Sequence, residues 1–152
     1  MMESLIYNFG YVGLFIAAFL SSTIIPLSSE TVVVLMTTLN YNIWLVLIFA
    51  TIGNYSGDLT NYCLGKYGNK FFLAKHLKPK IKKKKRRKLE KAYSKWGSPL
   101  LFFSWLPFVG ESICIISGAF NLNIRIFSFW VILGETFRYM IVIGAVKFFI
   151  IS

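Results

Sequence analysis

Four of the six acidic residues in this 152-residue chain lie inside long apolar stretches, where an ionised side chain is costly. They are Glu30, Asp58, Glu111 and Glu135, and Arg138 is the cation set deep in such a stretch. Ionisable groups at membrane depth cost at least ~2.5 kcal/mol each on insertion scales, so they usually face a cavity or a partner. These five side chains therefore predict a polar path for a substrate or for protons.

The neighbours of these charges in the sequence suggest different roles for them. Arg138 lies one helical turn beyond Glu135, which predicts a local ion pair. Glu30 and Glu111 have no cation nearby in the sequence, and carboxylates in such places suit the uptake and release of protons. The alternative is structural, with a protonated glutamate capping a freed helix end. For Asp58 both interpretations stay open.

Glu30 and Glu111 also belong to a repeat with an offset of 81 positions. Pro26-x-x-x-Glu30 returns as Pro107-x-x-x-Glu111. The other polar and small residues that match are Gly53 with Gly134, Asn40 with Asn121, and Asn42 with Asn123. Duplicated apolar segments interrupted by proline at matching places are typical of transporter binding sites.

The composition predicts that the elements carrying these residues lie in a membrane. The chain is 56% hydrophobic and 18% aromatic but only 15% charged, with a mean hydropathy of +0.61. The apolar runs are long and nearly free of charge, which predicts one integral membrane domain rather than a soluble core. We expect no cleaved signal peptide. Cys63 and Cys114 lie in apolar segments without a CxxC motif, so we expect neither a disulfide nor a metal site.

Segment lengths indicate which parts cross the bilayer. A crossing helix needs about 20 apolar residues, which residues 43–64 and 124–150 provide. Residues 5–39 and 99–122 are interrupted by polar and helix-breaking residues, and we predict two re-entrant helical hairpins there. A plain spanning helix over residues 5–20 is the alternative for the first of them. The breaks are expected at Pro26, Pro107 and Gly110.

The predicted fold is an all-α integral membrane protein with an inverted repeat. Each repeat is a re-entrant hairpin plus a transmembrane helix: repeat 1 spans about residues 5–65, and repeat 2 about 98–151. One crossing per repeat inverts the second relative to the first. The two hairpin tips, with Glu30 and Glu111, are then expected to face each other near the middle of the membrane. Between the repeats, residues 66–97 form a basic loop.

That loop carries most of the net charge of +11. All 17 lysines and arginines except Arg125, Arg138 and Lys147 lie between Lys66 and Lys95. A short basic loop stays in the cytoplasm, which places both chain ends on the opposite side. Apolar residues at helical spacing, followed by Gly97 and Pro99, predict an amphipathic helix on the membrane surface. The residues expected to contact anionic head groups are Lys82, Lys83, Lys84, Lys85, Arg86 and Arg87. Nucleic acid is not an expected partner, because the sequence has no motif that resembles a nucleic-acid-binding motif.

The first crossing helix has a glycine pattern of its own. Gly53 and Gly57 form a small-xxx-small spacing that lets helix backbones approach closely. Gly65 and Gly68 are expected to end that helix at the cytoplasmic surface. A polar stripe of Asn54, Asp58, Asn61 and Tyr62 is more than packing requires.

These residues resemble a known family. The order Gly53-x-x-x-Gly57-Asp58-x-x-x-Tyr62-x-x-Gly65-x-x-Gly68 is similar to the signature of DedA (VTT-domain, SNARE-associated) membrane proteins. Pro26-x-x-x-Glu30 and Phe103-x-x-x-Pro107 sit where that family has its two re-entrant loops. Most members have arginines three residues before and after the second-loop proline, where this chain has Ser104 and Gly110. Trp105-Leu-Pro107-x-x-Gly110-Glu111, with Arg138-Tyr139, is closer to the short YqaA-like branch.

The resemblance implies a multi-pass protein of the bacterial cytoplasmic membrane that translocates or scrambles lipids. Family members handle lipids that include polyprenyl phosphates, support envelope homeostasis and in some cases depend on the proton gradient. The missing arginines put a function that needs them to hold a phosphate in doubt. Alternatives are a proton-coupled carrier of small solutes, or a non-transporting membrane scaffold or chaperone. We expect no enzyme activity and no cofactor, and a homo-oligomer stays open.

Overall fold

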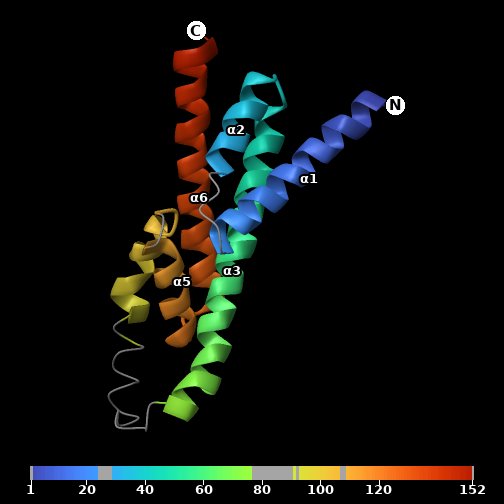
Figure 1. Ribbon diagram of the computed structural model, residues 1–152. Helices are drawn as coiled ribbons and strands as arrows, with labels where there is room; N and C mark the ends of the chain where they lie inside the picture. The colour runs from blue at the N-terminus through green and yellow to red at the C-terminus, as the bar shows by residue number, and fades with distance from the viewer. Residues whose placement is uncertain (1, 24–28, 77–90, 92, 107–108, 152) are drawn as a thin grey trace. The chain divides into compact units, whose positions relative to one another are not determined.

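The structure is a computed structural model that describes residues 2–23, 29–76, 91, 93–106 and 109–151. These residues are almost entirely helical and contain no strand, which confirms the all-α prediction for this part of the chain (Figure 1). The helices are α1 (Met2–Thr23), α2 (Ser29–Thr38), α3 (Ile43–His76), the π-helical η1 (Tyr93–Gly97), the 3₁₀-helical η2 (Ser98–Phe103), α5 (Val109–Ala119), α6 (Ile124–Val146) and the π-helical η3 (Lys147–Ile151).

The chain forms two compact units that divide both long helices. The first unit is Met1–Gly57 with Glu135–Ser152, and the second is Asp58–Gly134. The first unit thus holds α1, α2, the start of α3 and the end of α6. Its core is a cluster of buried apolar residues from all four of these elements: Tyr11, Leu14, Val33, Met36, Val46, Ala50, Tyr139 and Ile143.

One helix of the described residues is long and apolar enough to span a membrane. It runs over Ile124–Phe149, with a mean hydropathy of 1.6 in its most apolar window. Only 33% of that window is buried in the structure, so most of its apolar surface is turned outward, as lipid would require. The predicted crossing at residues 43–64 is helical but less apolar, because polar side chains such as Asn54, Asp58 and Asn61 interrupt it.

The predicted hairpins correspond to pairs of separate elements. The first pair is α1 and α2, and the second is η2 and α5; Pro26 and Pro107 lie outside the described residues. α2 has 10 residues and α5 has 11. At 1.5 Å per residue each is about 15 Å long, half the thickness of a bilayer core. Their length suits the predicted re-entrant arms, whose entry and return on one side stay a prediction.

The same turn connects α2 to α3 and α5 to α6, with corresponding hydrogen bonds 81 positions apart. Asn40 (φ 58°) and Asn121 (φ 53°) are the non-glycine residues with positive φ in the described part of the chain. In the first turn, the Asn40 N–H donates a hydrogen bond to Thr37 O, and the Tyr41 N–H donates one to Met36 O. In the second turn, the Asn121 N–H donates a hydrogen bond to Gly118 O, and the Leu122 N–H donates one to Ser117 O. This is the Schellman motif, and asparagine fits its left-handed position better than most residues.

A second asparagine begins the next helix in each turn. The Asn42 Oδ1 accepts a hydrogen bond from Trp44 N–H at 3.1 Å, and the Asn123 Oδ1 accepts one from Arg125 N–H at 2.9 Å. Each side chain therefore caps the residue two positions on, as an N-cap does. The pattern Asn-x-Asn thus specifies a helix end and a helix start, and its recurrence supports the duplication.

Removing either asparagine cap is expected to lower the stability of the fold. Asn42→Ala and Asn123→Ala should each lower the free energy of unfolding by about 1 kcal/mol, because a helix-start N–H loses its acceptor. Asn42→Ser, which keeps a capping oxygen, should stay close to wild type. Thermal unfolding in detergent measures the series. Equal stability of the alanine and serine variants would contradict this role.

Glycines allow close backbone contacts within each unit. In the first unit, a Cβ at Gly53 would lie 2.5 Å from Phe15 O, and one at Gly57 would lie 2.8 Å from Phe19 O. α1 therefore crosses α3 at the predicted small-xxx-small spacing (Figure 1). In the second unit, a Cβ at Gly65 would lie 1.9 Å from the carbonyl oxygen of Ile115.

The prediction that Gly65 and Gly68 end this helix is wrong. α3 continues to His76, and no described glycine has a positive φ, the conformation that ends helices. Glycine costs only about 1 kcal/mol inside a helix, which tertiary packing readily outweighs. Gly65 serves the contact with α5 instead.

The predicted amphipathic helix falls mostly outside the described residues. This holds for all six basic residues from Lys82 to Arg87. Of the predicted end, Gly97 is the last residue of η1, and Pro99 lies in the first turn of η2. Trp96, in η1, is 76% exposed.

Candidate functional site

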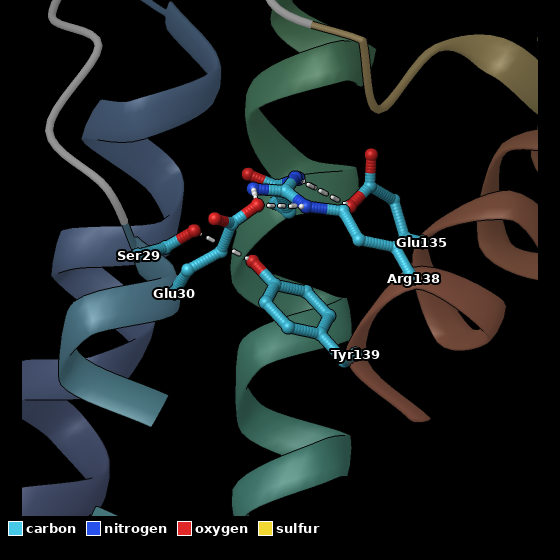
Figure 2. Close-up of polar contacts among 6 residues, drawn as sticks. Ser29, Glu30, Glu135, Arg138 and Tyr139 are labelled. Atoms are coloured by element: carbon cyan, nitrogen blue, oxygen red, sulfur yellow. Dashed lines mark hydrogen bonds and ion pairs between the residues drawn. The ribbon is translucent and has the colours of Figure 1, made fainter. Parts of the chain in front are cut away.

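The first unit brings charged and polar side chains from three helices into one cluster. Glu30 lies in the first turn of α2, and Glu135, Arg138 and Tyr139 follow one another on α6. Asn54 comes from α3 and Ser29 from the start of α2. Figure 2 shows the Arg138 guanidinium between the carboxylates of Glu30 and Glu135. We call these six residues the arginine cluster.

Arg138 binds both carboxylates at the same time. Its Nε and Nη2 donate to Glu30 Oε1 at 3.0 and 2.9 Å, and its Nη1 lies 3.3 Å from Glu135 Oε2. Glu30 has no cation nearby in the sequence, but Arg138, 108 positions away, contacts it in the fold. The pair between Glu135 and Arg138, by contrast, is local, at i and i+3.

The two carboxylates differ sharply in exposure. The Glu135 side chain is 1% exposed, whereas that of Glu30 is 47% exposed, and Arg138 lies between at 12%. With all three groups ionised the cluster carries a net charge of −1. A buried ion needs a partner, and Arg138 supplies one to Glu135. The Glu30 carboxylate can also be solvated, and the N-terminus of α2 favours its negative charge.

Asn54 is a second hydrogen-bond partner of Glu135. Its amide Nδ2 donates to Glu135 Oε2, the oxygen that also faces Arg138. The two residues are 81 positions apart, which is the offset of the predicted repeat. The remaining oxygens, Glu135 Oε1 and Asn54 Oδ1, are buried without a hydrogen bond, as is the hydroxyl of Thr51 one turn earlier on α3. The cluster thus has unused acceptors for a proton, a water or a polar ligand.

Tyr139 contacts Arg138 through its ring and α2 through its hydroxyl group. Its ring centroid lies 5.1 Å from the guanidinium carbon, within the range of a cation–π contact. Its hydroxyl forms a 2.9 Å hydrogen bond with Ser29 Oγ (Figure 2). Sequence reasoning missed the role of Ser29, because neither its type nor its spacing distinguishes it from the other serines near Pro26.

Asp58 and Glu111 belong to the second unit. Asp58 is 3% exposed and lies on the predicted polar stripe of α3, where Asn61 and Tyr62 are also buried. The Tyr62 hydroxyl donates to Leu122 O at 2.6 Å, so part of this stripe holds the turn before α6. Glu111 is half-buried in the first turn of α5, the position equivalent to Glu30 in α2.

Gly110, in the first turn of α5, lies close to the backbone of Ser104 and Leu106. Gly110 N–H donates to Leu106 O at 2.8 Å. A Cβ at Gly110 would lie 1.6 Å from Ser104 O. A side chain at position 110 is therefore excluded in the first turn of α5, which explains the glycine of this chain.

A metal site is not apparent in the described ranges. They contain no group of three or more His, Cys, Asp or Glu side chains placed to hold an ion. Cys63 is half-buried and Cys114 is buried, and no disulfide joins them.

The chain is similar to proteins of bacteria and archaea. The VTT domain matches residues 25–148. The inner membrane protein YqaA of Escherichia coli is 34% identical over 137 residues, which cover 88% of each chain. A Haemophilus influenzae protein is 33% identical over 137 residues, covering 84% of this chain and 81% of the relative. The protein MJ0201 of Methanocaldococcus jannaschii is 29% identical over 142 residues, covering 92% and 86%. No solved structure matches the chain. With its apolar α6, its duplicated turns and this match over most of its length, the chain belongs to the VTT-domain (DedA) family of membrane proteins.

Proposed function

We propose that this protein translocates lipids, with phosphate-bearing lipids as the preferred class, across a bacterial cytoplasmic membrane. The observation that carries the proposal is the place of the arginine cluster on α6. Glu135 and Arg138 lie near the middle of the stretch Ile124–Phe149, so a membrane that this helix spans has an ion pair close to its midplane. Charges at that depth mark substrate and ion pathways.

The repeat supports a transporter over a scaffold. Equivalent turns recur 81 positions apart, and the equivalent residues Asn54 and Glu135 touch each other. Duplicated segments around a polar binding site are the common plan of secondary transporters. In this proposal Glu30, Asp58, Glu111 and Glu135 line the polar path and Arg138 holds the anionic group, with proton transfer through the carboxylates as the coupling.

The proposal also includes the membrane in which the protein lies and its orientation there. Similarity to an inner membrane protein supports the cytoplasmic membrane, and the basic loop, with Lys82, Lys83, Lys84, Lys85, Arg86 and Arg87, supports a cytoplasmic position between the repeats. The same six cations would bind anionic head groups, at about 1 kcal/mol each near the surface. The proposal needs no covalent chemistry from the protein.

A reconstitution experiment tests the function. Purified protein in liposomes is compared with protein-free liposomes, using fluorescent lipids with phosphate, phosphocholine or uncharged head groups and a membrane-impermeant quencher. We expect faster exchange between leaflets with the protein, and the largest gain for the phosphate head group. Uptake of a small solute without lipid exchange would favour the carrier alternative. Protein-free rates for all lipids and solutes would leave only the scaffold.

A further inference from the structure

The contact between Arg138 and Glu30 uses the guanidinium in an unusual way. The Nε–Nη2 edge of arginine is a rigid fork whose two N–H groups match two oxygens of a carboxylate or phosphate. Here both N–H groups bind the same oxygen, Glu30 Oε1, and Oε2 takes no part in either bond. The two N–H groups of the fork therefore share one oxygen atom, although they could bind two.

The rest of Arg138 is fixed in place. Nη1 faces Glu135, whose side chain is 1% exposed and is held in turn by the Asn54 amide. The Tyr139 ring lies against the guanidinium, and the Tyr139 hydroxyl is bonded to Ser29. A guanidinium ordered by buried partners loses little further freedom when it binds a ligand. The fork is thus pre-organised independently of Glu30.

Glu30 is the partner that can leave. Its side chain is 47% exposed, against 12% for Arg138, so water can take over its carboxylate. Ion pairs with an exposed member contribute little net stability. The negative charge that Glu30 brings to the fork, together with the N-terminus of α2, marks this position as one that favours an anion.

We infer that the Nε–Nη2 edge of Arg138 is a binding fork for a phosphate group and that Glu30 is its resident counter-ion, which the phosphate displaces. This inference rests on the proposed function and specifies its binding step. Glu30 then limits affinity: it competes for the fork and leaves a second negative charge near the bound phosphate. Removing its charge should tighten binding, whereas a simple structural ion pair predicts no gain.

Equilibrium binding tests the inference. The full chain in phosphatidylcholine nanodiscs is titrated with phosphatidic acid mixed into the bilayer, and separately with inorganic phosphate in solution. Retained lipid is counted by native mass spectrometry, and melting temperature reports the fold. We expect Glu30→Gln to bind phosphate about tenfold more tightly than wild type, since it loses the carboxylate that competes for the fork and one charge–charge repulsion beside the bound phosphate.

Three comparisons complete the test. Arg138→Lys keeps the charge but not the fork, and should bind about tenfold more weakly than wild type. Arg125→Gln removes an exposed arginine from the start of the same helix, and should match wild type. A response to phosphatidic acid alone assigns the ligand to a lipid head group, and a response to inorganic phosphate alone assigns it to a soluble anion.

The two proposals fail separately. Unchanged or weaker binding by a folded Glu30→Gln variant, or wild-type binding by Arg138→Lys, would overturn the fork even if lipid exchange is fast. Tighter binding by Glu30→Gln without any lipid exchange would keep the fork and reject the translocase.

Discussion

Replacing Arg138 by glutamine is expected to reduce lipid exchange to the protein-free rate and to destabilise the fold. The substitution leaves Glu135, with its 1% exposed side chain, without its cation. Breaking a buried ion pair by removing one partner typically costs 3–5 kcal/mol, because the remaining charge stays buried. The loss should appear as a lower melting temperature in detergent and as less folded protein after reconstitution.

A double variant separates transport from folding. Arg138→Gln combined with Glu135→Gln removes both charges, and the uncharged side chains keep hydrogen-bonding groups for Asn54 and Glu30. We expect this protein to recover most of the lost stability, since replacing a buried pair by neutral groups is often tolerated. Transport should remain absent, because no cation is left to hold an anionic head group. Wild-type exchange by the stable double variant would remove Arg138 from the mechanism.

Gly65→Ala and Gly68→Ala should have opposite effects on stability, although both glycines lie on α3. A Cβ at Gly65 would meet the Ile115 carbonyl oxygen at 1.9 Å, and backbone cannot move aside as a flexible side chain can. We expect a loss of about 3 kcal/mol in the free energy of unfolding, at the upper end of the usual cost of overpacking. Gly118→Ala, which meets Tyr62 O at 1.9 Å, should behave in the same way.

Gly68→Ala is the matched control. No atom lies within 4 Å of its Cβ position, and its φ is not positive. Alanine there should stabilise α3 by about 0.5–1 kcal/mol, because the unfolded chain loses freedom and the helix loses a poor helix former. Denaturant or thermal unfolding in detergent measures all three variants. Similar gains at positions 65 and 68 would mean that helix propensity, not contact with α5, controls this segment.

The local part of the architecture could be predicted from the sequence because it depends on neighbours a few residues apart. The Asn-x-Asn turns are an example: the Schellman motif, the left-handed asparagine and the N-cap are all completed within one turn of chain. The pair of Glu135 and Arg138 is another, since residues three apart on a helix must meet. The helical, apolar character and the family follow from the same kind of pattern.

The sequence by itself therefore determined the helices, the duplicated turns and the charges available at membrane depth. Only the tertiary structure decided how those charges are shared. Arg138 meets Glu30 across 108 positions and Tyr139 meets Ser29 across 110, because α2 and α6 pack in the same core. Packing likewise decided that Gly65 is a contact with α5 rather than a helix end. Such contacts depend on which helix faces meet, and residue types at a given spacing do not specify that.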